Sequence, residues 1–151
     1  MSSGRTHKTV GVVSGAGAVY LHNHISQSQH HLTDYIGGVV GGYFGAKLAD
    51  IIDPPTSPNH RSIGHGIIQN SILATVIYEN IDQFRKHCFQ QAETYHQRAS
   101  QCKEQPLQEL LLRLLAEAFK FAAGLATGLI AGHLSHLALD ATTAKSLPLI
   151  F

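Results

Sequence analysis

This chain of 151 residues has little net charge and few cysteines, and both facts exclude several classes of protein. The formal net charge is +1, which is too small to give the electrostatic footprint of a nucleic-acid-binding domain. The two cysteines, Cys88 and Cys102, form no CxxC or Cys/His pairing, so a cysteine-based zinc site is not expected. A disulfide between them would need suitable geometry, and we expect two reduced thiols instead.

Motifs for nucleotide binding and for nucleophilic catalysis are also missing. Residues 37–45 are rich in glycine, but they lie inside a helical pattern and no Gly-Lys-Ser/Thr follows them. No Gly-x-Ser-x-Gly elbow occurs, so a serine hydrolase is not indicated. The apolar stretch at residues 10–21 lacks the leucine-dense centre of a secretory signal, and we therefore do not expect a secreted protein.

The hydrophobic residues recur with a period near 3.6, and no segment alternates as a strand would, so we predict an all-α fold. Four helical segments are expected in a single domain of residues 1–151, over residues 6–23, 33–52, 59–104 and 107–140. Thr33 or Asp34 is expected to cap the second segment. Residues 79–105 are charged and glutamine-rich with one sparse apolar side, which predicts a long polar helical arm.

Glycine is common inside the helical segments, where it has a cost. The chain has 14 glycines, and Gly124, Gly128 and Gly132 form a stripe on one helix face. Each glycine in a helix interior destabilises the helix by about 1 kcal/mol relative to alanine, so a compensating interaction is needed. Close backbone approach between neighbouring helices is the usual one, and we predict a glycine-rich, closely packed bundle.

Residues 121–139 carry no Asp, Glu, Lys or Arg over about the length that spans a bilayer. Residues 107–120 before them are amphipathic, with a strong apolar face. We interpret the chain as associated with the inner (cytoplasmic) membrane and as a homo-oligomer. The alternative is a soluble, cytoplasmic helical bundle that oligomerises through its apolar faces.

Histidine is abundant, with 11 residues, but only its placement can indicate a metal site. Asp50 and Asp53 are three residues apart at the end of a helical segment, so both can point the same way. Three prolines stiffen the stretch that follows, and His60 and His65 come soon after it. We interpret these four residues as metal ligands. The alternative is that the aspartates end the helix and face solvent.

A second candidate pair lies near the C-terminus. His136 and Asp140 are at i and i+4 of one helical segment, so both can reach one ion without distorting the helix. His133 shares that face only in part, and it is either a second-shell group or an accidental neighbour. Arg61 can offer a planar fork of donors to a phosphate, or it can form a surface salt bridge with an aspartate.

At these residues the chain resembles the YdjM-like family of predicted metal-dependent hydrolases, which are often membrane-associated. The match rests on an N-terminal histidine, His7, on Asp-Ile-Ile-Asp-Pro and His-Arg-x-x-x-His in the middle, and on Gly-His-Leu-Ser-His-Leu-Ala-Leu-Asp near the end. The resemblance covers most of the chain outside the polar arm. The chain lacks the histidine that often follows the second aspartate in this family, and Gly66 stands where a serine is common.

The family is distantly similar to zinc-dependent phospholipases C and single-strand-specific zinc nucleases, which are all-helical phosphoesterases. The resemblance implies a metal shell of His7, Asp50, Asp53, His60, His65, His136 and Asp140. It implies a divalent ion, zinc first and Mg²⁺, Mn²⁺ or Fe²⁺ as alternatives, that hydrolyses a phosphoester in a small molecule or lipid. Asp53 or Asp50 would bridge ions or act as general base, and Arg61 would stabilise negative charge.

A different class of function stays open beside the hydrolase. The chain would then be a membrane-associated or oligomeric interaction protein with a structural or degenerate metal site. In that case the glycine stripes serve helix packing, and the polar arm of residues 79–105 binds the partner.

Overall fold

The computed structural model of this chain describes the backbone of residues 4–52 and 67–141. Its helices are α1 (Gly4–Ile25), α2 (Leu32–Ile52), α3 (Ile67–Gln101) and α4 (Pro106–Ala141). No strand occurs within these two ranges, and the prediction of an all-α fold with four main helices is confirmed. The polar arm is helical as predicted, because α3 continues without a break to Gln101.

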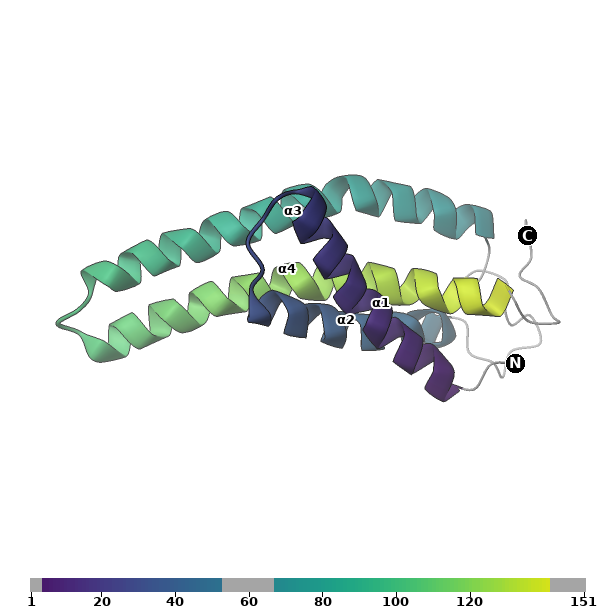
Figure 1. Ribbon diagram of the computed structural model, residues 1–151, viewed down its shortest axis with the longest axis horizontal. Coiled ribbons are helices and arrows are strands. Elements are labelled where there is room, and N and C mark those ends of the chain that lie inside the picture. Colours follow the sequence, from purple (N-terminus) through teal and green to yellow (C-terminus); the bar gives the residue numbers. More distant parts are fainter. Residues whose placement is uncertain (1–3, 53–66, 142–151) are drawn as a thin grey trace.

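The four helices form an elongated bundle (Figure 1). α3 and α4 make a long antiparallel hairpin, and α1 and α2 pack against the C-terminal part of α4. α2 runs parallel to α4 and antiparallel to α1. In the described ranges no Cα atom of α3 comes within 8 Å of α1 or α2, so α3 packs its backbone on α4 alone.

The turn between α1 and α2 reverses the chain at Gln27, whose φ of 52° is the left-handed conformation. The amide of Ser28 donates to the carbonyl of Asn23 at 2.9 Å, which closes the last turn of α1. α2 then begins at Leu32, one or two residues before the predicted cap. The prediction that Thr33 or Asp34 caps this helix is wrong. The Thr33 hydroxyl donates to Glu117, and the buried carboxylate of Asp34 accepts hydrogen bonds from Arg85 and Asn23.

Glycine brings α2 into backbone contact with α4. A Cβ atom on Gly37, Gly41 or Gly45 would overlap a backbone carbonyl of α4, and one on Gly124 or Gly128 would overlap a carbonyl of α2. On another face of α2, Gly38 and Gly42 meet Gly15 and Gly11 of α1 in the same way. The predicted glycine-rich close packing is therefore confirmed.

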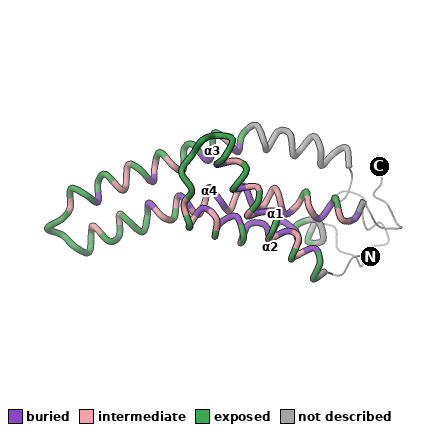
Figure 2. The backbone as a smooth tube through the Cα atoms, in the orientation of Figure 1, coloured by how far each residue is buried: buried purple, intermediate pink, exposed green. Residues whose placement is uncertain are grey.

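Large apolar side chains remain exposed on α2, and Figure 2 shows how far each residue of the bundle is buried. The exposed residues on this helix form two groups, about 120° apart around the helix axis: Leu32, Ile36 and Val39 in its first half, and Phe44, Leu48 and Ile51 in its second. From Leu32 to Ile51 they extend about 28 Å at 1.5 Å per residue, close to the ~30 Å hydrocarbon thickness of a bilayer. Exposed apolar surface on this scale marks a site of contact with a membrane or with another protein.

One helix in the described ranges is long and apolar enough to cross a membrane, namely α4 over Pro106–Asp140. Only 28% of its most apolar stretch is buried inside the bundle. Residues 121–140 of α4 are mostly buried or half-buried, because α1, α2 and α3 all pack against this helix.

Candidate metal centre

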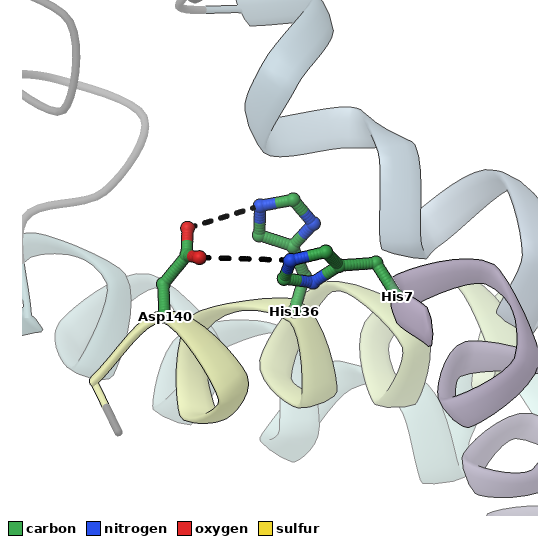
Figure 3. Close-up of side chains that lie close together, drawn as sticks. All are labelled: His7, His136 and Asp140. Atoms are coloured by element: carbon green, nitrogen blue, oxygen red, sulfur yellow. Dashed lines mark ion pairs between the residues drawn. The ribbon is translucent and has the colours of Figure 1, made fainter. Parts of the chain in front are cut away.

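Three side chains from the two ends of the chain meet at one end of the bundle (Figure 3). His7 comes from the first turn of α1, and His136 and Asp140 come from the end of α4. Nε2 of His7 lies 3.6 Å from one carboxylate oxygen of Asp140, and Nε2 of His136 lies 3.4 Å from the other. One ligand atom from each residue falls within 4.8 Å of the others. All three side chains are buried.

The glycine packing places these side chains. Gly11 of α1, Gly42 of α2 and Gly132 of α4 lie in one closely packed layer. One helical turn from that layer, in the direction of the site, are His7 on α1 and His136 on α4. The two imidazole rings stack with centroids 4.1 Å apart. Because the helices approach so closely, side chains from α1 and α4 can reach the same ion.

A backbone carbonyl fixes the orientation of His136. Nδ1 of His136 lies 2.5 Å from the carbonyl oxygen of Ala46 on α2. Because a carbonyl can only accept, Nδ1 carries the proton and donates to it. The lone pair of the neutral ring is then on Nε2, the nitrogen that faces Asp140. This is the tautomer of a metal ligand whose second nitrogen donates to a carbonyl outside the first coordination shell.

The electrostatics of the location favour a cation. Helix C-termini carry partial negative charge, and Asp140 adds a carboxylate at that end of α4. No basic residue lies in the last turn of α4 or of α2, where Asp50 lies. The N-terminus of α1, which supplies His7, carries partial positive charge here, so the negative charge that a cation would offset is chiefly that of the Asp140 carboxylate.

The donor set fits a divalent transition metal. Two imidazole nitrogens and one carboxylate oxygen are typical ligands of zinc, and three protein ligands are the usual number at catalytic zinc sites. Ligands held about 2.0–2.1 Å from a tetrahedral ion lie roughly 3.3 Å from one another. The two histidine nitrogens lie 3.6 and 3.4 Å from different oxygens of Asp140, and one ligand atom from each residue lies within 4.8 Å of the others, so the side chains must draw closer to bind one ion.

The structure brings together three of the seven predicted ligands: His7, His136 and Asp140. Asp50 is one helical turn beyond Ala46 on α2, and its side chain is outside the described part of the chain. The predicted Asp53, His60, Arg61 and His65 also lie outside the described residues. His133 lies one turn before His136 on α4 and is not one of the three grouped ligands.

A second buried polar cluster was not predicted from the sequence. Arg85 of α3 donates to Asp34 of α2, to Asn23 of α1 and to Thr127 of α4, at 2.7–3.0 Å. Asn23 in turn donates to Asp34 at 2.9 Å. Each helix supplies one residue, and no two of them are close enough in sequence to form a motif. Only the tertiary packing could have revealed this cluster.

The structure also contains a cavity of about 530 Å³, away from the three ligands. It lies between the α1–α2 turn and α3, and its lining includes His22, Ser26, Asp82, Lys86 and Phe89. It shares no residue with the His–His–Asp group. Much of the lining charge is already paired, because Lys86 contacts Asp82 at 2.6 Å. We therefore assign the metal chemistry to the His–His–Asp group and not to this cavity.

Comparison with curated proteins and with solved structures gave no match. The YdjM inner membrane protein family matches residues 1–151, which is the whole chain. The membrane location in the family's name agrees with the candidate span in α4 and with the exposed apolar face of α2. On this match, the chain belongs to the YdjM inner membrane protein family.

Proposed function

We propose that the chain is a membrane-associated, metal-dependent hydrolase of phosphoester bonds. The observation that carries the proposal is the convergence of His7, His136 and Asp140, whose ligand atoms lie within 4.8 Å of one another. His7 is 129 positions before His136 and 133 before Asp140, so local structure does not explain why it meets them. The same three residues belong to the metal shell that the family resemblance implies.

When bound here, a divalent ion would lower the pKa of a coordinated water to about 7 and polarise a phosphoryl oxygen. The side chains of the protein supply the ligand atoms and the balancing charge. His7 and His136 present Nε2, and Asp140 contributes the negative charge that balances the ion. The carbonyl of Ala46 holds His136 in the ligating tautomer. The donor set fits zinc first, with Mn²⁺, Fe²⁺ or Mg²⁺ as alternatives.

The remaining predicted residues complete the proposed site. Asp50 follows Ala46 by one turn of α2, so its backbone lies toward the same end of the bundle as the ligands. We assign Asp50 and Asp53 the roles of further ligand or general base. His60 and His65 are proposed as additional ligands, with His133 as a supporting residue behind the ligands. Arg61 would stabilise the negative charge that develops on the phosphoryl group.

The surroundings of the site favour a substrate that comes from the membrane. Leu48 and Ile51 are exposed on α2, within five residues of Ala46. An apolar tail could follow this face while a phosphoester headgroup reaches the ligands. We therefore propose a lipid phosphoester as the substrate class, with a small phosphoester as the alternative.

Metal analysis and a phosphodiesterase assay on the same samples test the proposal. The protein is purified in detergent, its metal content is measured, and hydrolysis of bis(4-nitrophenyl) phosphate is followed. The variants are His136→Ala and Asp53→Ala, with His24→Ala as control because His24 is exposed and distant from the trio. We expect both site variants to lose metal and activity and the control to keep both. Unchanged metal content in His136→Ala would remove the site assignment.

A second function is favoured by one observation, the burial of the site. Only 1% of the His136 surface, 7% of His7 and 5% of Asp140 are exposed. Structural metal sites are closed and fully coordinated, whereas catalytic sites keep an open position. If the metal is structural, the wild type will bind it and gain thermal stability but will hydrolyse no phosphoester, and the protein serves as a membrane interaction module.

A further inference from the structure

Three positive side chains gather where α1 begins and α2 ends, at the same end of the bundle (Figure 1). We call them the basic cluster: Arg5, Lys8 and Lys47. The two lysines share the ring of Tyr43, because the ammonium group of Lys47 lies 4.8 Å from its centroid and that of Lys8 lies 5.9 Å from it. Arg5 is three residues before Lys8 on α1, a spacing that puts both on one side of the helix.

Within the described part of the chain, no carboxylate pairs with any member of the basic cluster. Cations elsewhere in the bundle do have such partners on their own helix: Lys86, Arg113 and Lys120. Asp140, the acid at the end of α4, faces the two histidines of the metal centre instead. Like charges held close together repel one another, and an anion bound among them removes that repulsion. The basic cluster is therefore suited to bind an anion.

The basic cluster lies on the side of α2 that faces away from α4. Gly45 of α2 is in contact with the backbone of α4. Lys47 is two residues further along, about 160° around the helix axis from Gly45. Arg5 is exposed, and Lys8 and Lys47 are half-exposed, so a ligand can reach all three. The anion site is thus open, and it is separate from the buried His–His–Asp group.

An exposed apolar edge borders the basic cluster. Phe44 packs edge-on against Tyr43 with ring centroids 5.4 Å apart, and 52% of its surface is exposed. Leu48 is exposed one helical turn further along α2. A ligand that covers both the cations and this edge has an anionic group joined to an apolar part. Free phosphate lacks the apolar part, whereas a phospholipid has both, and the chain belongs to an inner membrane protein family.

We propose that the basic cluster binds the headgroup of an anionic phospholipid. Lys8 and Lys47 donate to the phosphate oxygens, Arg5 adds a third positive charge, and an acyl chain runs over Phe44. The Tyr43 ring holds the two ammonium groups near each other through cation–π contacts. This lipid is bound without being hydrolysed, because the site lies away from the metal centre. The inference does not depend on the proposed hydrolase activity.

Fluorescence quenching tests the site. The chain has no tryptophan, so Tyr43→Trp places a single reporter beside both lysines and keeps an aromatic ring there. The full chain in detergent is titrated with brominated phosphatidylglycerol or with brominated phosphatidylcholine. EDTA is present throughout, so that a headgroup bound to a metal ion does not contribute. We expect half-maximal quenching at a several-fold lower mole fraction of phosphatidylglycerol than of phosphatidylcholine.

Three double variants of the Tyr43→Trp protein identify the groups that bind the headgroup. Lys8→Gln/Lys47→Gln should weaken phosphatidylglycerol binding roughly 25-fold, because each cation near an anionic membrane surface contributes about fivefold. Lys8→Arg/Lys47→Arg keeps the charge and should keep the binding. Lys86→Gln/Lys103→Gln removes the same charge from exposed lysines of the α3–α4 hairpin, and it should bind phosphatidylglycerol as the parent protein does.

Equal quenching by the two lipids would overturn the proposal, since the charge of the headgroup would then have no effect. An equal loss of binding in Lys86→Gln/Lys103→Gln would overturn it as well, because the attraction would then depend only on net charge. Displacement of the brominated lipid by inorganic phosphate would contradict the choice of a lipid, since it would mean that the basic cluster binds a soluble anion.

Discussion

Arg85 on α3 holds the carboxylate of Asp34 on α2 through two parallel hydrogen bonds of 3.0 and 2.9 Å. Both residues are buried, with 1% and 0% of their surface exposed. Asn23 of α1 and Thr127 of α4 accept further hydrogen bonds from the same guanidinium. Because the backbone of α3 packs on α4 alone, this side chain ties α3 to α1 and α2.

Replacing Arg85 with methionine should destabilise the protein strongly. The carboxylate of Asp34 would stay buried without its cation, and breaking such a pair costs about 3–5 kcal/mol. Thermal unfolding in detergent measures the loss. Lys86→Met is the control, because the Lys86 side chain is 68% exposed and its ion pair with Asp82 is on the surface.

The double variant Arg85→Met/Asp34→Leu separates the pair from its surroundings. With both charges gone, the loss of stability should be smaller than the sum of the two single losses. Strict additivity of the single variants would contradict the assignment of Arg85 and Asp34 as a coupled pair.

Gly128→Ala should destabilise the bundle, and Gly17→Ala should not. A Cβ on Gly128 would overlap the carbonyl of Gly38, so α2 and α4 must move apart. Gly17 has nothing within 4 Å of its added Cβ, and alanine there gains up to about 1 kcal/mol of helix propensity. Melting temperatures of both variants decide the matter. Similar changes in melting temperature for the two variants would mean that the close contact of α2 with α4 does not require glycine at position 128.

Glu117 should make stability depend on pH. Burial raises the pKa of this carboxyl, but hydrogen bonds from Lys120 and Thr33 outweigh that effect, and the net pKa lies below its ordinary 4.5. A lowered pKa in the folded state stabilises the fold above pH 4.5, and this stabilisation is lost as the pH falls through the lowered value. Glu117→Gln should therefore melt below the wild type at pH 7 and approach it in acid.

The pH prediction is checked by melting curves of wild type and Glu117→Gln from neutral pH into the acid range. Glu104→Gln serves as control, because Glu104 is exposed in the turn before α4. A difference between wild type and Glu117→Gln that stays constant over the whole range would mean that the hydrogen bond from Thr33 does not require the charged carboxylate.

Chelation should lower the melting temperature of the wild type but not of His7→Ala or His136→Ala. A ligand at 100 times its Kd stabilises the folded state by about 2.7 kcal/mol, which is roughly 5–10 °C for a chain of this size. Both variants lack a ligand, so they have no metal-dependent stability to lose. His24→Ala should respond as the wild type does. A chelator shift of equal size in all four proteins would place the metal elsewhere.

Much of the fold follows from local sequence signals. The helical period and the glycine stripes predict the helices and their close packing, because both depend on residues a few positions apart. The spacing of His136 and Asp140 predicts their common face for the same reason. His7 is an isolated histidine, and only the family resemblance indicated it.

The predictions that the structure contradicts concern features that depend on tertiary packing. Asp34 has the residue type and position of a helix cap, yet Arg85, 51 residues away, takes its carboxylate. The apolar face around Leu110 and Leu114 resembles a core face, but in one chain it remains exposed. The roles of Asp50, Asp53, His60, Arg61 and His65 stay predictions.

The most direct test of the metal centre is a crystal structure of the zinc-loaded protein with anomalous scattering measured at the zinc edge. We predict an anomalous peak about 2.0–2.2 Å from Nε2 of His7, Nε2 of His136 and a carboxylate oxygen of Asp140. Ordered density for these three side chains with no peak between them, or a peak bound only by other residues, would contradict the account.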